Sequence, residues 1–116
     1  MTKHTVLIAE DKDFLAKVIV ANFPKDVTCV VASDWDCAIG KVHDVDAVIA
    51  SMNIVGRGGE SLLAAIKKLK DIPVVCLTSN LTSAIRIKLL KEGADDVVTK
   101  PFNPEELSLR LLRFLK

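Results

Sequence analysis

The chain has 116 residues, a length that a single hydrophobic core can serve, and half of its residues are hydrophobic while 27% are charged. This composition is typical of a globular domain and excludes a disordered chain. Sixteen basic residues balance 15 acidic ones. The resulting formal charge of +1 argues against a domain that binds the phosphates of a nucleic acid directly.

Neither a membrane span nor a leader is expected. The longest uncharged stretch, residues 72–85, contains several polar residues and falls short of the roughly 17–25 apolar residues that cross a bilayer. The three cysteines have no paired spacing, and His4 and His43 lie far apart, so we expect thiols in a reducing compartment and no zinc site. We therefore predict one domain over residues 1–116, located in the cytoplasm.

Strand-like and helical segments alternate along the chain. Five short apolar runs rich in β-branched residues predict strands at residues 5–9, 27–32, 47–50, 73–77 and 97–99. Each is followed by a segment with helical spacing of apolar residues. The second of these segments, residues 34–43, has the weakest helical pattern. The apolar residues of the other four are, in chain order, Phe14, Leu15, Val18, Ile19 and Phe23; Leu62, Leu63, Ile66 and Leu69; Ile85, Leu89 and Leu90; and Leu107, Leu111, Phe114 and Leu115. This order predicts an α/β fold, a doubly wound parallel sheet with helices on both faces.

Boundary signals agree with these elements. Residues 103–106 (Asn-Pro-Glu-Glu) are typical of an N-cap, a proline in the first turn and a capping-box glutamate. Gly93 is placed to end the fourth helix in the left-handed conformation. Ser33 or Asp34 can cap the second helix.

Polar residues follow four of the predicted strands. In an open parallel sheet the carboxyl ends of the strands meet at a crevice, which is where ligands bind. Any one of these residues could be an ordinary cap or a solvated charge, but together they indicate a site: Glu10, Asp11, Ser51, Asn53, Thr78, Ser79, Asn80 and Lys100.

Several segments resemble the receiver domain of bacterial two-component response regulators. They are residues 6–11 (Val-Leu-Ile-Ala-Glu-Asp), residues 46–53 with Gly56 and Gly59 after them, Leu77-Thr78, and residues 93–102 (Gly-Ala-Asp-Asp-Val-Val-Thr-Lys-Pro-Phe). The last segment is the most specific, and the resemblance extends over essentially the whole chain. It implies a flavodoxin-like (βα)5 fold with strand order 2-1-3-4-5.

The resemblance also implies roles for individual residues. Glu10 and Asp11 match the acid pair that helps to hold magnesium, and Asn53 matches the residue whose backbone carbonyl completes the protein ligands. Thr78 matches the hydroxyl that contacts the phosphoryl group, and Lys100 matches the lysine that pairs with the acids and then with the phosphoryl oxygens. The bond from Lys100 to the following proline matches one that is typically cis.

Ser51 departs from the family at the position of the phosphate-accepting aspartate. The neighbours on both sides align without a gap, and Asp46 lies at the other end of the same strand. A serine hydroxyl is un-ionised at neutral pH and needs a general base, but no histidine lies at the strand ends and Asp11 is a weak base. We therefore expect a degenerate receiver, or pseudo-receiver, that takes up no phosphoryl group and is not an enzyme.

The same replacement weakens the metal site. It removes one of three acids from a cluster with one lysine, and a unit charge at ~4 Å contributes about 4 kcal/mol at an effective dielectric near 20. Because magnesium prefers charged oxygen ligands, we expect weak binding or none at Glu10, Asp11 and Asn53, and no other cofactor. Lys100 should instead pair with Glu10 or Asp11, or hydrogen-bond to Ser51.

Two further departures favour natural divergence. Val97 stands where the family usually has an aromatic residue that swings inward on phosphorylation, and valine has no such swing. Val55 stands where a proline commonly stiffens the loop, and the glycines that follow leave that loop mobile.

The resemblance places the partner surface on the fourth helix, fifth strand and fifth helix. Candidate interface residues are Arg86, Lys88, Lys91, Asp96, Arg110 and Arg113, with Asp95 beside them. Charges of both signs suit a homodimer that pairs each with its opposite, although a solvated face would look the same. The expected partners are proteins: a histidine kinase, an output domain or another signalling protein.

At least one of Leu109 and Leu112 should lie away from the core, which suggests a covered surface.

Three alternatives belong to other classes. The chain could be a phosphorelay receiver with an altered acceptor site. It could also be a module that binds an anion or metabolite in the vacated crevice, with Thr78, Lys100 and loop amides as donors. A serine hydrolase around Ser51 is disfavoured, because the sequence has neither a Gly-x-Ser-x-Gly elbow nor a nearby histidine.

Overall fold

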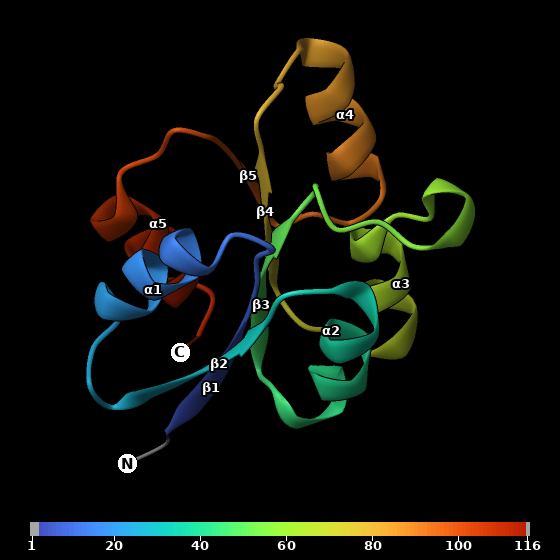
Figure 1. The fold of residues 1–116 in the computed structure, drawn as a ribbon. Coiled ribbons are helices and arrows are strands. Elements are labelled where there is room, and N and C mark those ends of the chain that lie inside the picture. The colour runs from blue at the N-terminus through green and yellow to red at the C-terminus, as the bar shows by residue number, and fades with distance from the viewer. Residues whose placement is uncertain (1–2, 116) are drawn as a thin grey trace.

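The computed structural model describes residues 3–115 and contains one parallel sheet of five strands (Figure 1). The strands are β1 (His4–Ala9), β2 (Val27–Ala32), β3 (Ala47–Ser51), β4 (Val74–Thr78) and β5 (Asp96–Thr99). Their order in the sheet is β2-β1-β3-β4-β5, so the predicted flavodoxin-like order is confirmed.

Helices cover both faces of this sheet (Figure 1). They are α1 (Asp13–Ala21), α2 (Trp35–Lys41), α3 (Leu62–Leu69), α4 (Ser83–Lys91) and α5 (Pro104–Leu112), with short 3₁₀ turns η1 (Val42–Asp44) and η2 (Arg57–Gly59). One hydrophobic cluster packs α1 and α5 against the sheet, and a second packs α2, α3 and α4 against the other face. None of the helices between residues 3 and 115 is long and apolar enough to cross a membrane.

The central strands are apolar because both of their faces are covered. Every residue of β3 and β4 is buried, and so are the last four residues of β1. Neighbours along a strand point to opposite faces: Val48 belongs to the cluster under α2, α3 and α4, whereas Ile49 belongs to the cluster under α1 and α5. The register pairs Ala9 with Ala50 and Ala50 with Cys76, so these three strands end at one edge.

The predicted N-caps and the glycine after α4 are confirmed, but the Glu106 carboxylate bonds Arg110 and does not complete a capping box. The Asn103 side chain accepts a hydrogen bond of 3.0 Å from the Glu106 amide, with Pro104 at the first helical position of α5. Asp34, not Ser33, caps α2 by accepting from the Cys37 amide. Gly93 ends the α4 segment at a φ of 107°, where an L side chain would be strained.

Three apolar residues with helical spacing are not buried. Phe14 in α1 is 79% exposed, Leu90 in α4 is 47% exposed, and Leu69 at the end of α3 is also exposed. A helix lying on a sheet buries one stripe, and in α1 that stripe passes through Ala16 and Ile19, to one side of Phe14.

Candidate functional site

Four strand ends bring together the residues that the sequence singled out. Glu10 follows β1, Ser51 ends β3, Thr78 ends β4, and Lys100 follows β5. The Lys100 amide donates to the Thr78 carbonyl at 2.8 Å, which holds the start of the β5–α5 loop against the end of β4. The Lys100–Pro101 peptide bond is cis, as predicted from the resemblance. The structure therefore brings four of the predicted residues, Glu10, Ser51, Thr78 and Lys100, to the predicted edge of the sheet.

Lys100 reaches across the sheet edge to two of these residues. Its Nζ lies 2.9 Å from Oε1 of Glu10 and donates to Oγ of Ser51 at 3.1 Å. Glu10 and Ser51 are fully buried, and the lysine side chain is largely so. Two of the three contacts that the sequence offered for Lys100 are thus present, and the ion pair forms with Glu10.

The two oxygens of Glu10 have different contacts. Oε2 accepts from the Lys12 amide at 2.9 Å, at the turn that leads into α1, whereas Oε1 lies close to Lys100 without forming a hydrogen bond to any described residue. A buried carboxylate needs such partners because desolvation of an unpaired charge is costly. Sequence reasoning missed this contact, since the donor is a backbone group that no side-chain pattern reveals.

Asp11 points to a different environment. It is exposed, and no basic group between residues 3 and 115 lies within 4 Å of its carboxylate. Interaction with the Glu10 side chain is the largest cause that lowers the pKa of Asp11 below its ordinary value; burial opposes it, and Lys100 and Lys12 add smaller lowering effects. Asp11 is therefore ionised at neutral pH and open to solvent.

The residues present fit magnesium poorly. Of the two acids in the crevice, Glu10 is already neutralised by Lys100, and Ser51 supplies a neutral oxygen. The Ser51 hydroxyl also accepts a long hydrogen bond of 3.4 Å from the Asn53 amide, which ties it to the following loop. Within the described residues, no three side chains of His, Cys, Asp or Glu are grouped so that they could hold a metal ion.

Thr78 turns its hydroxyl toward the chain that follows it. Oγ1 accepts from the Asn80 amide and donates to the Asn80 carbonyl, both at 3.3 Å. Thr78 also borders a cavity of 210 Å³ that lies between the loop after β3 and α4, where Met52 and Leu89 are among the lining residues. Its hydroxyl is thus engaged by Asn80 and is not bonded to Lys100 or Ser51.

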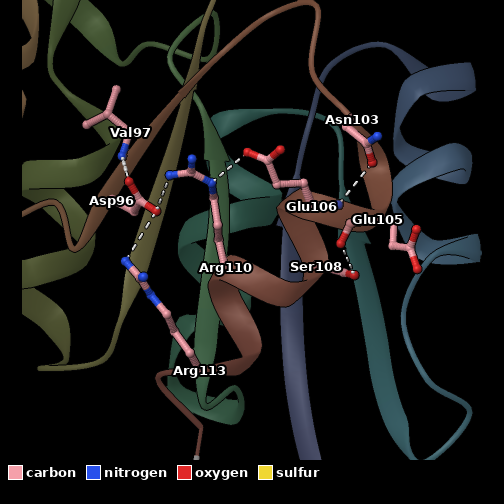
Figure 2. Close-up of polar contacts among 8 residues, drawn as sticks. All are labelled: Asp96, Val97, Asn103, Glu105, Glu106, Ser108, Arg110 and Arg113. Atoms are coloured by element: carbon pink, nitrogen blue, oxygen red, sulfur yellow. Dashed lines mark hydrogen bonds and ion pairs between the residues drawn. The ribbon is translucent and has the colours of Figure 1, made fainter.

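The predicted partner surface consists of α4, β5 and α5, and Figure 2 shows its α5 side. Arg110 bonds Asp96 and Glu106, each at 3.0 Å, and Arg113 lies 3.6 Å from Asp96. These hydrogen bonds raise the pKa of Arg110, so it stays charged. Asp96 is therefore not a free acid, because its ion pairs link β5 to α5.

The remaining charges of that surface differ. Asp95 is held by Lys67 at 2.9 Å and by the Val74 amide at 2.8 Å. In contrast, Arg86, Lys88 and Lys91 are exposed, and across residues 3–115 no carboxylate lies within 4 Å of any of them. Asp95 and Asp96, two acids that a second copy was expected to pair with, are therefore already paired within the chain.

The expectation for the leucines of α5 holds. Leu109 is 60% exposed and Leu112 is partly buried, so one leucine of α5 does lie away from the core. Val97 is buried against the α2–α3–α4 side of the sheet, with no aromatic ring at this position.

The fold and the crevice define a signalling receiver module, and comparison with known proteins agrees. The family model "Response regulator receiver domain" matches residues 6–112, and the chain belongs to this family. A similar solved structure is the receiver domain of the Francisella response regulator 1452, which is 28% identical and has a TM-score of 0.86, with 97% of this chain and 96% of that one covered. Chemotaxis protein CheY4 of Vibrio cholerae shares the fold at 24% identity and a TM-score of 0.84, over 98% and 100% of the two chains.

Curated relatives are longer than this chain. The probable transcriptional regulator ycf27 of Guillardia theta is 34% identical over 99% of this chain but only 46% of its own length. The phosphate regulon transcriptional regulatory protein PhoB of Escherichia coli is 34% identical over 91% of this chain and 49% of its own. The chain thus spans about half the length of the curated relatives it matches.

Proposed function

We propose that this receiver is a pseudo-receiver, a cytoplasmic protein-interaction module that takes up no phosphoryl group and catalyses no reaction. The observation that carries the proposal is the buried Ser51 hydroxyl at the acceptor position, to which Lys100 donates a hydrogen bond. The position that would carry the nucleophilic anion thus holds a neutral hydroxyl.

The chemistry of that hydroxyl supports the same conclusion. Lys100 donates to Ser51 Oγ, and a donor cannot remove the proton that a serine must lose in order to attack. Glu10 forms an ion pair with Lys100 and accepts from the Lys12 amide, and no carboxylate of the described residues accepts a hydrogen bond from Ser51 Oγ. The exposed Asp11 has a lowered pKa, which makes it a weaker base still.

The same contacts argue against a module that binds anions in the crevice. Lys100 is the cation that an anion would need, and Glu10 already compensates its charge in a buried position. A free anion would have to displace the Glu10 carboxylate from Lys100, although Glu10 is buried and covalently part of the chain. We therefore place the signalling surface outside the crevice, and we infer that the partner is another signalling protein such as a histidine kinase or an output domain.

Phosphoryl uptake is the decisive measurement. The purified chain is incubated with acetyl phosphate and magnesium, and its intact mass is followed over time, with Ser51→Asp as the matched variant. The wild-type chain should keep its mass. A gain of about 80 Da, the mass of one added phosphoryl group, on the wild-type chain would refute the proposal. If neutral hydroxylamine released the adduct, it would be an acyl phosphate on an acid such as Asp11; an adduct that resists hydroxylamine and acid would be an ester on Ser51.

A further inference from the structure

The α4 helix has two sides with different surroundings. Its outer face carries the exposed apolar pair Ile87 and Leu90 with the basic side chains Arg86 and Lys91 beside it, and this face belongs to the partner surface described above. Its inner side buries a single side chain, Leu89, and Figure 1 shows α4 standing out from the body of the domain. Between this inner side and the loop after β3 lies the cavity of 210 Å³.

Aliphatic side chains form most of the walls of this cavity. It opens to solvent where Val55 and Lys88 are exposed. A cavity of about 150 Å³ lined by apolar side chains is large enough to bind benzene, so the present one has room for a branched aliphatic ligand. Among the described residues no aromatic ring lines it, and the aliphatic ones that do are Met52, Ile54, Val55, Leu62, Ile85 and Leu89.

Two opposite charges stand at the rim of the cavity. Lys88 and Glu92 are four residues apart and lie on one side of the helix, yet their charged groups form no ion pair within 4 Å. The Glu92 carboxylate is engaged elsewhere, because its Oε1 accepts from the Ser61 hydroxyl at 2.9 Å. Within the described chain nothing donates to Glu92 Oε2, and no carboxylate lies within 4 Å of Lys88. Both charges are therefore open to a ligand.

The other polar side chains of the cavity already have partners. Thr78 Oγ1 exchanges hydrogen bonds with Asn80, and the Ser61 hydroxyl donates to Glu92 and accepts from the Ala64 amide. A sugar or a nucleotide needs several free donors and acceptors around it. A phosphate needs more positive charge than one lysine beside a glutamate provides. The cavity therefore disfavours these classes of ligand.

A ligand with a single charge fits only half of the rim. A fatty acid would place its carboxylate at Lys88 but close to the Glu92 carboxylate, which repels it. An alkylamine would meet Glu92 and be repelled by Lys88. A molecule that carries both charges on one carbon, with an aliphatic chain beside them, matches the rim and the walls together.

We infer that this cavity binds a free aliphatic α-amino acid of the size of leucine, with its carboxylate at Lys88, its ammonium at Glu92 and its side chain in the apolar interior. The site shares Thr78 with the crevice but uses neither Lys100 nor Ser51. A bound amino acid joins α4 to the loop after β3, and it stabilises the chain because it binds only the folded state. The inference goes beyond the proposed function and does not depend on it, because it involves no phosphoryl group.

The test is a calorimetric titration of the purified chain with L-leucine, accompanied by ¹⁵N amide spectra. Leucine should bind, and the amide shifts should include Met52 and Leu89. Isocaproate, which lacks the ammonium, and isoamylamine, which lacks the carboxylate, should each bind about tenfold more weakly, because one charge-assisted contact is lost. Glycine, which lacks the aliphatic chain, should bind about a hundredfold more weakly.

Variants of the rim and the wall assign the contacts. Lys88→Gln and Glu92→Gln should each weaken leucine binding about tenfold, and the amide of the second variant can still accept from Ser61. Lys88→Gln should leave the affinity for isoamylamine no lower, since that ligand has no carboxylate to lose. Ile85→Phe, which places a ring in the cavity, should abolish leucine binding while circular dichroism shows the chain folded. Lys91→Gln on the outer face and Lys68→Gln on α3 are exposed matched controls and should leave leucine affinity unchanged.

Three results would overturn the inference. Isocaproate that binds as tightly as leucine would make the site one for fatty acids. Leucine affinity that ignores both Lys88→Gln and Glu92→Gln would place the ligand elsewhere. The third is the absence of shifts at Met52 and Leu89 at millimolar leucine.

Failure of this inference is separable from failure of the proposed function. The titration contains no phosphodonor, so it reads the cavity alone, while the mass measurement reads the crevice alone. A chain that gains a phosphoryl group and still binds leucine loses only the proposed function. A chain that gains none and ignores leucine loses only the inference about the cavity.

Discussion

The crevice and the outer face of α4 differ in whether their charged side chains are paired within the chain. In the crevice, the buried Glu10 forms an ion pair with Lys100, whose side chain is largely buried. On α4, Arg86, Lys88 and Lys91 are exposed, and the described chain supplies them with no acid. The place where a receiver does its chemistry is internally satisfied, and a surface away from that place is not.

This difference indicates where a partner can gain binding energy. An ion pair that is already formed in a dry site offers little to an incoming group, which would first have to break it. Exposed cations around an apolar pair offer both electrostatic attraction and area for burial. Four measurements test this difference between the crevice and α4.

The largest effect is expected from Lys100→Met. The variant leaves Glu10 as a buried, uncompensated carboxylate, which should lower the free energy of unfolding by about 3–5 kcal/mol. The measurement is urea unfolding followed by circular dichroism. The double variant Glu10→Gln with Lys100→Met should recover most of the loss, and Arg86→Met on α4 should cost less than about 0.5 kcal/mol. Equal losses for Lys100→Met and Arg86→Met would erase the contrast.

The second effect is a difference in the unfolding free energy lost when each of two adjacent leucines of α4 is truncated. Leu89 is buried under the helix, so Leu89→Ala should cost about 2–3 kcal/mol, toward the low end for such a truncation because α4 is loosely packed. Leu90→Ala should change the unfolding free energy by no more than about 0.5 kcal/mol. The same urea series measures both. If Leu90→Ala proved as costly as Leu89→Ala, the outer face would be structural rather than free.

The third effect concerns the acceptor position. Ser51→Asp adds a carboxylate beside the Lys100–Glu10 pair, and without metal it should lower stability by about 1–2 kcal/mol through repulsion from Glu10. Millimolar magnesium should raise the melting temperature of this variant, because an ion that binds only the folded chain stabilises it. Ser51→Asn is the neutral control and should show no such rise. A variant indifferent to magnesium would mean that the surrounding acids no longer form a metal site.

The smallest effect is a pH dependence beneath α4. Burial, with a smaller contribution from Glu92, raises the pKa of the Cys76 thiol to about 12. A thiol with a raised folded pKa stabilises the fold fully below its ordinary pKa near 9, and this contribution is lost as pH rises toward 12. By pH 10 the loss should be about 1 kcal/mol. Urea unfolding at pH 8 and pH 10 measures it, and Cys76→Ala should remove that part of the pH dependence. A wild-type chain whose Cys76 reacts readily with iodoacetamide at pH 8 would show that α4 does not cover it.

Much of the fold could be predicted because its signals are local. Apolar runs located all five strands within one or two residues, and the Asn-Pro-Glu-Glu segment located the start of α5 at Pro104. The crevice followed from a rule about parallel sheets, which placed Glu10, Ser51 and Lys100 together before any distance was known. Two of the alternatives offered for Lys100, the contacts with Glu10 and Ser51, are both present.

What the sequence could not provide are pairings between distant residues. Asp96 is free in a linear reading, and only the packing of α5 on β5 brings Arg110 and Arg113 to it. Helical spacing also grouped Leu90 with Leu89 as one apolar face, although neighbouring residues on a helix point about 100° apart and α4 buries only one of them. The signal that could have separated them is Ile87, an apolar residue out of phase with the buried stripe.

One hydrogen bond gives α4 a mechanical role as well. Ser61 caps α3 by accepting from the Ala64 amide at 3.2 Å, and its hydroxyl donates to Glu92 at 2.9 Å. The C-terminal end of α4 is thereby tethered to the first turn of α3, while its opening turn at Thr82 has only its own cap. A displacement of the C-terminal end of α4 would therefore move Ser61, the residue at the end of the loop that follows Ser51.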